Sequence, residues 1–174
     1  MKITRNLELV CPAKRGNSEH FIENCIAFMS GLYLDDKQFT ESFLLVPRVA
    51  IDVLILNKSN QFLLTRRGIE PELGKWHIPG GFLLKGESIV ERIERIGVEE
   101  LGFTISANDC RLAQVSDNLD ADPRGHIVDI VYKCRVLRDI LLKPWGDSVE
   151  LGFFNNIPKD IGFNHAQILS KWYN

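Results

Sequence analysis

The chain has 174 residues and a net charge of −2, with 45% hydrophobic and 25% charged residues. These values are ordinary for one globular domain with a proper core. The near-neutral charge gives no reason to expect nucleic acid or a membrane surface as the main partner. No apolar run reaches the length of a membrane span, and the start, MKITRNLELV, lacks the apolar segment of a signal peptide. We therefore expect a cytoplasmic protein.

Four cysteines are present, without the close pairing or the histidine spacing of a zinc site. Cysteines of this kind are typical of reduced thiols that pack in a protein interior. They are Cys11, Cys25, Cys110 and Cys134.

The N-terminal part of the chain predicts two short helices. Apolar residues recur at helical spacing over residues 18–30, which indicates an amphipathic helix. This helix either packs on the outside of the domain or contacts a second copy, so a homodimer is one option. A second helix, capped by Asp35 or Asp36, is expected through about Leu45.

Two strands follow. Residues 48–57, RVAIDVLILN, are mostly β-branched or apolar and predict a nearly continuous buried strand. Residues 61–67, QFLLTRR, return antiparallel after a hairpin turn. Asp52 interrupts the first strand, so we expect it at a sheet edge or facing a site. Arg66 and Arg67 end the second strand on opposite faces, so at least one of them can reach a phosphate.

A loop and a helix rich in carboxylates occupy residues 80–103, GGFLLKGESIVERIERIGVEELGF. At about 100° per residue, the helix has an apolar stripe that faces the core. Glu100 falls inside this stripe, where a carboxylate needs a partner. Glu99 and Arg95 lie one turn apart and can pair. The glutamates form either a solvated helix end or a site for a hard divalent cation, and solvation explains Glu100 poorly.

The rest of the chain alternates between strands and polar loops. His77, just before the carboxylate-rich segment, is expected to be a surface strand residue rather than a base. Residues 114–125 read as a polar acidic loop. Together the elements predict an α/β fold, an α/β/α sandwich around a mixed sheet. The later elements expected are three strands and a C-terminal helix, at residues 104–115, 126–137, 149–154 and 164–173.

Residues 81–103 resemble the Nudix box, G-x5-E-x7-R-E-U-x-E-E-x-G-U, in which U is a bulky aliphatic or similar residue. Ile96 departs from this pattern, because it stands where the first glutamate of the R-E pair belongs. Gly97 departs as well, because an aliphatic residue is usual there. The order of elements over residues 46–174 also resembles a Nudix domain, which leaves residues 1–45 as an N-terminal extension. The positions that match the box are Gly81, Glu87, Arg95, Glu99, Glu100, Gly102 and Phe103.

The resemblance implies a metal site and a substrate class. Nudix boxes bind Mg²⁺ or Mn²⁺ and position a nucleoside diphosphate linked to a sugar or another moiety. Carried over by position, the carbonyl of Gly81 and the carboxylates of Glu99 and Glu100 are the metal ligands. Glu87 and Arg95 support the loop and the helix and complete the catalytic set. Hard cations prefer such oxygen ligands, and a diphosphate needs its charge neutralised before water attacks.

The departure at Ile96 leaves three explanations open, because in many members the missing glutamate is a ligand or the general base. In the first, the base comes from a loop outside the box. In the second, the protein resembles the GDP-mannose mannosyl hydrolases, which tolerate an aliphatic residue here and attack the sugar carbon. In the third, the domain binds a nucleotide without hydrolysis. The candidate bases are Asp117, Asp120, Asp122, Asp147 and Glu150.

Two further segments bear on the substrate. In the GDP-mannose enzymes, an aspartate at the place of Asp52 and an arginine in the TRR segment contact the nucleotide sugar. This resemblance predicts that Asp52, Arg66 and Arg67 bind the substrate. The segment DADPRGHIVDIVY instead resembles the ADP-ribose pyrophosphatase branch.

Overall fold

The computed structural model describes residues 34–137, 142–144 and 146–172. The helix predicted at residues 18–30 lies outside these ranges, as do Cys11 and Cys25. Cys110 and Cys134 are free, buried thiols that lie opposite each other on two neighbouring strands. Within the described ranges, no helix is long and apolar enough to span a bilayer.

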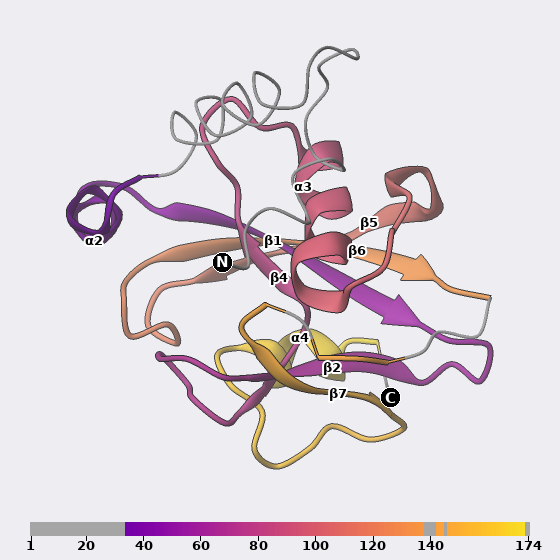
Figure 1. The fold of residues 1–174 in the computed structure, drawn as a ribbon. Coiled ribbons are helices and arrows are strands. Elements are labelled where there is room, and N and C mark those ends of the chain that lie inside the picture. Colours follow the sequence, from indigo (N-terminus) through magenta and orange to yellow (C-terminus); the bar gives the residue numbers. More distant parts are fainter. Residues whose placement is uncertain (1–33, 138–141, 145, 173–174) are drawn as a thin grey trace, which may run out of the picture.

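One mixed sheet of seven strands forms the centre of the fold (Figure 1). The strands are β1 (Arg48–Leu56), β2 (Phe62–Arg67), β3 (Trp76–His77), β4 (Gly80–Phe82), β5 (Cys110–Asn118), β6 (Ile127–Arg135) and β7 (Ser148–Phe154). The main path runs β3-β2-β1-β6-β5, and β4 pairs with β1 while β7 pairs with β2. The β1–β6 pair is parallel, and the other pairs are antiparallel.

Two helices, α3 (Ile89–Ile96) and α4 (His165–Ser170), cover opposite faces of this sheet (Figure 1). Alternate residues of β1 pack on each side, with Val53 in the cluster of α3 and Leu54 in the cluster of α4. This two-sided burial explains why β1 is apolar almost throughout. The predicted α/β class and the mixed sheet with helices on both faces are confirmed.

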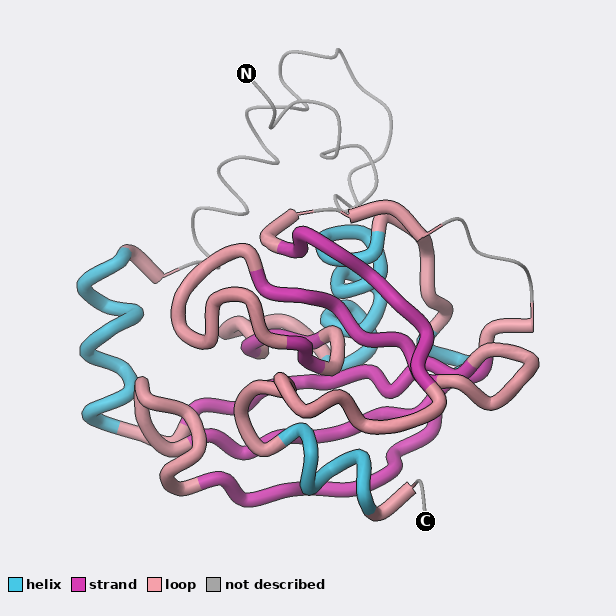
Figure 2. Tube along the Cα trace, turned by 90° about the horizontal axis from the view of Figure 1, so that it is seen from below, coloured by secondary structure: helices cyan, strands magenta, loops and turns pink. Residues whose placement is uncertain are grey.

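The remaining helical segments are short. α2 (Asp36–Leu45) begins at Asp35, whose carboxylate accepts a hydrogen bond from the main-chain N–H of Gln38, so the predicted second helix is confirmed. It lies at one end of the molecule, away from the two helices that cover the sheet (Figures 1 and 2). A π-helical turn, Gly97–Leu101, continues α3, and a 3₁₀ turn, Ala107–Asp109, precedes β5.

Several sequence predictions need correction. His77 is buried rather than on the surface, because it hydrogen-bonds Thr65 and packs against His165 of α4. The strand expected within residues 104–115 starts at Cys110 and runs on through Asn118, five residues into the predicted loop. The C-terminal helix is shorter than expected and ends at Ser170.

Candidate functional site

A pocket of about 610 Å³ opens between β1, β4, the end of α3 and three later loops. Predicted site residues that line it are Asp52, Arg67, Gly81, Arg95, Glu99 and Glu100. The lining is highly charged, and its ionisable side chains are Arg48, Arg67, Arg92, Arg95, Arg124, Asp52, Glu99, Glu100, Asp122, Asp129 and Asp147, besides two histidines.

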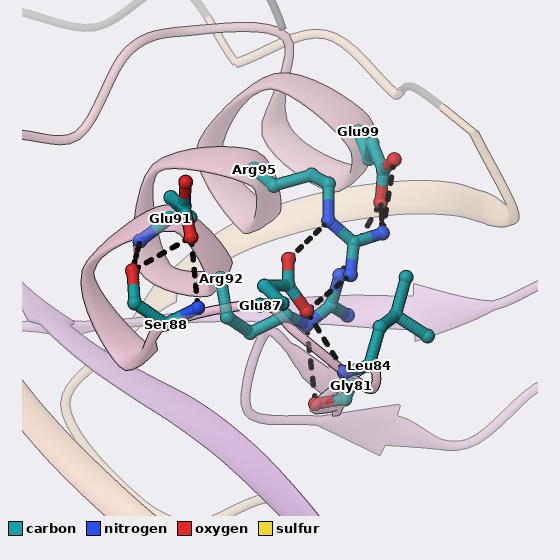
Figure 3. Close-up of polar contacts among 8 residues, drawn as sticks. All are labelled: Gly81, Leu84, Glu87, Ser88, Glu91, Arg92, Arg95 and Glu99. Carbon is teal, nitrogen blue, oxygen red and sulfur yellow. Dashed lines mark hydrogen bonds and ion pairs between the residues drawn. The ribbon is translucent and has the colours of Figure 1, made fainter. Parts of the chain in front are cut away.

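The loop and helix of the box are joined by a carboxylate–arginine network (Figure 3). Arg95 donates to both carboxylate oxygens of Glu87, at 2.6 and 2.9 Å, and to Glu99 at 2.9 Å. Glu87 also accepts the main-chain N–H of Leu84 at 2.9 Å. Because the side chains of Arg95 and Glu87 are almost fully buried, their charge-assisted bonds hold the loop on the helix and fix the position of Glu99.

Arg92 reaches the predicted metal ligands themselves. Its Nε donates to the main-chain oxygen of Gly81 at 3.2 Å, and its Nη1 donates to Glu99 at 3.4 Å (Figure 3). A Cβ atom at Gly81 would collide with the guanidinium, so only glycine leaves room for this contact. Two of the three predicted ligands thus already contact a positive charge.

Glu100 completes the predicted ligand set from the π-helical turn. Its Oε2 accepts the main-chain N–H of Gly80 at 3.3 Å. Burial raises the pKa of Glu100 to about 7, although Arg92 and this hydrogen bond favour the ionised form. A carboxylate in this environment gains stability from a cation, as its place in the apolar stripe suggested.

Both departures from the box have structural explanations. Ile96 is fully buried and packs with Ile93 and Leu101, so position 96 faces the core instead of the pocket. A Cβ atom at Gly97 would lie 2.6 Å from the main-chain oxygen of Phe103, which is too close for an aliphatic residue. The π-helical turn then ends at Gly102 in the left-handed conformation, with φ of 70°.

A buried polar cluster lies on the α4 side of the pocket. Asp52 on β1 is 3% exposed, and Asp129 lies on the neighbouring strand β6. The pKa values of both carboxyl groups are raised, mainly by burial and in addition by nearby acidic groups. Asn164 donates to Asp129 at 2.8 Å. Oδ2 of Asp52 and Oδ1 of Asn164 are buried and receive no hydrogen bond from any described residue. Both acceptors line the pocket, so they are available to hydrogen-bond donors of a ligand.

The two histidines next to this cluster are neutral. His165 accepts the main-chain N–H of Ile78 through Nδ1, so its Nε2 holds the proton, 3.8 Å from Oδ2 of Asp52. Burial lowers the pKa of both His77 and His165 to about 3. Neither histidine is therefore a cationic partner for the nearby carboxyl groups.

Two of the five candidate bases, Asp122 and Asp147, line the pocket. Asp122 is held by Arg124, at 2.9 Å from Nε and 2.7 Å from Nη2. Asp147 is exposed and follows Gly146, where a Cβ atom would collide with the main-chain oxygen of Glu99. The loop of Asp147 therefore packs against the main chain of Glu99 and lines the same pocket.

The other three candidates do not line the pocket. Asp117 pairs with His126 at 2.6 Å, and Glu150 pairs with Arg66 at 3.2 Å. Asp120 lies in the loop after β5, exposed to solvent.

The paired arginines of the TRR segment separate as predicted. Arg66 does not line the pocket, and its Nε donates to the main-chain oxygen of Gly74 at 2.7 Å. Arg67 lines the pocket, anchored by its Nε to the main-chain oxygen of Pro71 at 2.6 Å. Of the two, only Arg67 is placed to meet a ligand in this pocket.

Sequence reasoning missed Arg92, Asp129 and Asn164. Arg92 was detectable, because it falls within about 20° of Glu99 around the helix. Asp129 and Asn164 were not detectable, because strand pairing and the position of α4 bring them to Asp52 from distant parts of the chain.

The donor set suits a hard divalent cation. The Glu99 carboxylate and the main-chain carbonyl of Gly81 both accept hydrogen bonds from the Arg92 guanidinium, which lies there as a stand-in cation, and Glu100 lines the same pocket. Among the described residues, no three His, Cys, Asp or Glu side chains are grouped to hold a metal ion by themselves. A main-chain carbonyl, such as that of Gly81, is a further oxygen ligand that a hard cation accepts.

Comparison with known proteins identifies the class of this fold and site. The profile of the NUDIX domain matches residues 46–156. The ADP-ribose pyrophosphatase of Methanocaldococcus jannaschii is 37% identical over 133 residues, which span 74% of this chain and 76% of that protein. The chain therefore belongs to the NUDIX family of hydrolases.

Solved structures agree on the fold. The NUDIX domain of NrtR from Shewanella oneidensis, complexed with ADP ribose, superposes with a TM-score of 0.62 at 18% identity, covering 90% of this chain and 97% of that one. A bifunctional NMN adenylyltransferase/ADP ribose pyrophosphatase from Francisella tularensis, complexed with AMP and a Mn ion, gives a TM-score of 0.62 at 18% identity, covering 86% of this chain and 51% of that one.

Proposed function

We propose that this chain is a Mg²⁺- or Mn²⁺-dependent hydrolase of a nucleoside diphosphate linked to a sugar, with ADP-ribose as the first candidate substrate. The main support is that one pocket brings Gly81, Glu99 and Glu100 together with Arg67. The relative at 37% identity is named an ADP-ribose pyrophosphatase. Two proteins of the same fold were solved with ADP ribose or with AMP and a Mn ion.

The metal would be held by the carbonyl of Gly81 and the carboxylates of Glu99 and Glu100. A bound divalent ion neutralises the diphosphate and lowers the pKa of the attacking water. The buried Glu87–Arg95 pair keeps Glu99 and the glycine loop in place. These two residues are positioning residues rather than ligands.

Different parts of the pocket suit different parts of the substrate. Arg67 offers a guanidinium for a phosphate oxygen. The unpaired acceptors, Oδ2 of Asp52 and Oδ1 of Asn164, suit the hydroxyl donors of a sugar. Phe82 and Phe163 also line the pocket and give a nucleobase an aromatic surface.

Asp147 is our candidate for the general base. The step transfers a water proton to the Asp147 carboxylate while the water oxygen bonds to phosphorus. The bond between that phosphorus and the bridging oxygen breaks, and the bridging oxygen leaves with the other phosphate. From ADP-ribose, the products are AMP and ribose 5-phosphate.

The test is incubation of the full chain with Mg²⁺ and a panel of ADP-ribose, GDP-mannose, other nucleotide sugars and dinucleotides in ¹⁸O-labelled water. We expect ADP-ribose to be cleaved, with label in a phosphate product. Label in the free sugar would instead indicate attack at carbon, as in the GDP-mannose enzymes. Absence of turnover with every substrate would contradict the proposal.

A nucleotide-binding domain without hydrolysis is the second candidate. Arg92 favours this candidate, because its guanidinium already donates hydrogen bonds to two of the three predicted metal ligands. This candidate predicts saturable binding of ADP-ribose without turnover in the same panel, which isothermal titration calorimetry would detect.

A further inference from the structure

Arg92 differs from an ordinary surface arginine on a helix. Its side chain is 7% exposed, although long cationic side chains usually extend into solvent. Figure 3 shows it lying beneath Arg95 and reaching Gly81 at the edge of the loop. Its hydrogen bonds to the main-chain oxygen of Gly81 and to Glu99 both involve predicted metal ligands.

The charges around Arg92 explain why a cation is stable there. Burial lowers the pKa of Arg92, as does repulsion from Arg95, while Glu100 and Glu99 raise it. An arginine remains charged under these conditions. The guanidinium therefore offsets part of the repulsion between Glu99 and Glu100.

A divalent ion and this guanidinium need the same oxygens. Mg²⁺ binds its oxygen ligands at about 2.0–2.1 Å, so a metal ion and the Arg92 guanidinium would compete for lone pairs of the same two groups. Two cations held this close also repel each other. Metal binding and the hydrogen bonds of Arg92 therefore oppose each other.

We propose that Arg92 is a built-in cation that competes with the divalent metal for the Gly81 carbonyl and Glu99. Without metal, Arg92 holds these ligands. With metal, its guanidinium leaves them and remains in the pocket that it lines, where it meets the diphosphate. This inference rests on the metal site of the proposed function, but its tests need no substrate.

The first test titrates the Arg92→Met chain with Mn²⁺, and the electron paramagnetic resonance signal of free Mn²⁺ measures how much metal is bound. Methionine removes the charge and keeps an unbranched side chain for packing. We expect Mn²⁺ to bind about tenfold more tightly than to the wild-type chain, the result of removing one competing charge next to the site. The control is Arg111→Met, because the Arg111 guanidinium donates to the main-chain oxygens of Asn108 and Cys110 and does not line the pocket.

Unchanged or weaker Mn²⁺ binding by a folded Arg92→Met chain would overturn the proposal, and the Arg111→Met chain should match the wild type. A second measurement covers the case in which the variant does not fold. In the wild-type chain, the ¹⁵N–¹H resonance of Arg92 Nε should shift and exchange faster with water when Mg²⁺ is added. A resonance unchanged at saturating Mg²⁺ would also overturn it.

These outcomes separate the two proposals. If the chain hydrolyses nothing but binds Mn²⁺ more tightly after Arg92→Met, the role of Arg92 is supported and the proposed function is contradicted. If the chain hydrolyses ADP-ribose and Arg92→Met leaves the Mn²⁺ affinity unchanged, the proposed function is supported and the role of Arg92 is contradicted.

Discussion

Asp147 and Asp120 are both exposed aspartates in loops, but only Asp147 lines the pocket. If Asp147 accepts the proton of the attacking water, Asp147→Asn removes the acceptor and leaves the shape of the loop. We predict that kcat for ADP-ribose falls about 100-fold, the usual scale of general-base catalysis, while KM changes little. Steady-state kinetics measures this.

Asp120→Asn is the matched control and should keep the wild-type rate. Equal kcat values for the Asp147→Asn chain and the wild-type chain would exclude Asp147 as the base.

At the same scale, the sequence predicted some side chains well. Arg95 and Glu99 pair as expected from their spacing of one helical turn. The bond between Arg95 and Glu87 was not predicted from spacing, since the resemblance to the box implied only that both residues support the loop and the helix. Arg92 was missed because the pattern of the box assigns no role to its position. Asp52 was expected at an edge or facing a site, and it lines the pocket.

The element that determines the geometry of the site is α3 with its π-helical turn. The start of α3 was predictable, because Ser88 and Glu91 form reciprocal hydrogen bonds with each other's main-chain N–H groups. The stop at Gly102 was predictable as well. The π-helical turn was not, because it depends on the close approach of Phe103 to Gly97.

This element also determines the effect of restoring the missing glutamate. Because Ile96 is fully buried among apolar side chains, Ile96→Glu places a carboxylate in the core and not in the pocket. We predict no gain in hydrolysis and a loss of stability of about 3 kcal/mol or more, as for other unpaired buried charges. Urea unfolding measures the loss, and Ile96→Leu should stay close to the wild type.

A faster Ile96→Glu enzyme of wild-type stability would mean that position 96 reaches the pocket. Such a result would contradict the orientation of α3 described above.

At the scale of the whole molecule, the pocket joins parts of the chain that local pattern cannot connect. Asp52 and Asp129 become neighbours through the parallel pairing of β1 and β6. Asn164 and His165 join them only because α4 packs on that face. The class of fold was predictable from the order of elements, whereas the polar cluster required the tertiary structure.

Some predictions at this scale stay predictions. They are the division into an extension of residues 1–45 and a domain of residues 46–174, the homodimer, the absence of nucleic-acid partners and the cytoplasmic location.

The central claim is that Glu100 helps to hold a metal that the hydrolysis of ADP-ribose requires. The most direct measurement compares Mg²⁺-dependent hydrolysis by the Glu100→Gln chain, the wild-type chain and a control, Glu94→Gln, whose side chain is exposed on α3 outside the pocket. We predict that Glu100→Gln lowers kcat/KM about 100-fold or more, the scale of losing a metal-held charge, and that Glu94→Gln matches the wild type. A Glu100→Gln rate within about twofold of the wild type, well below that scale, would show that the metal binds elsewhere.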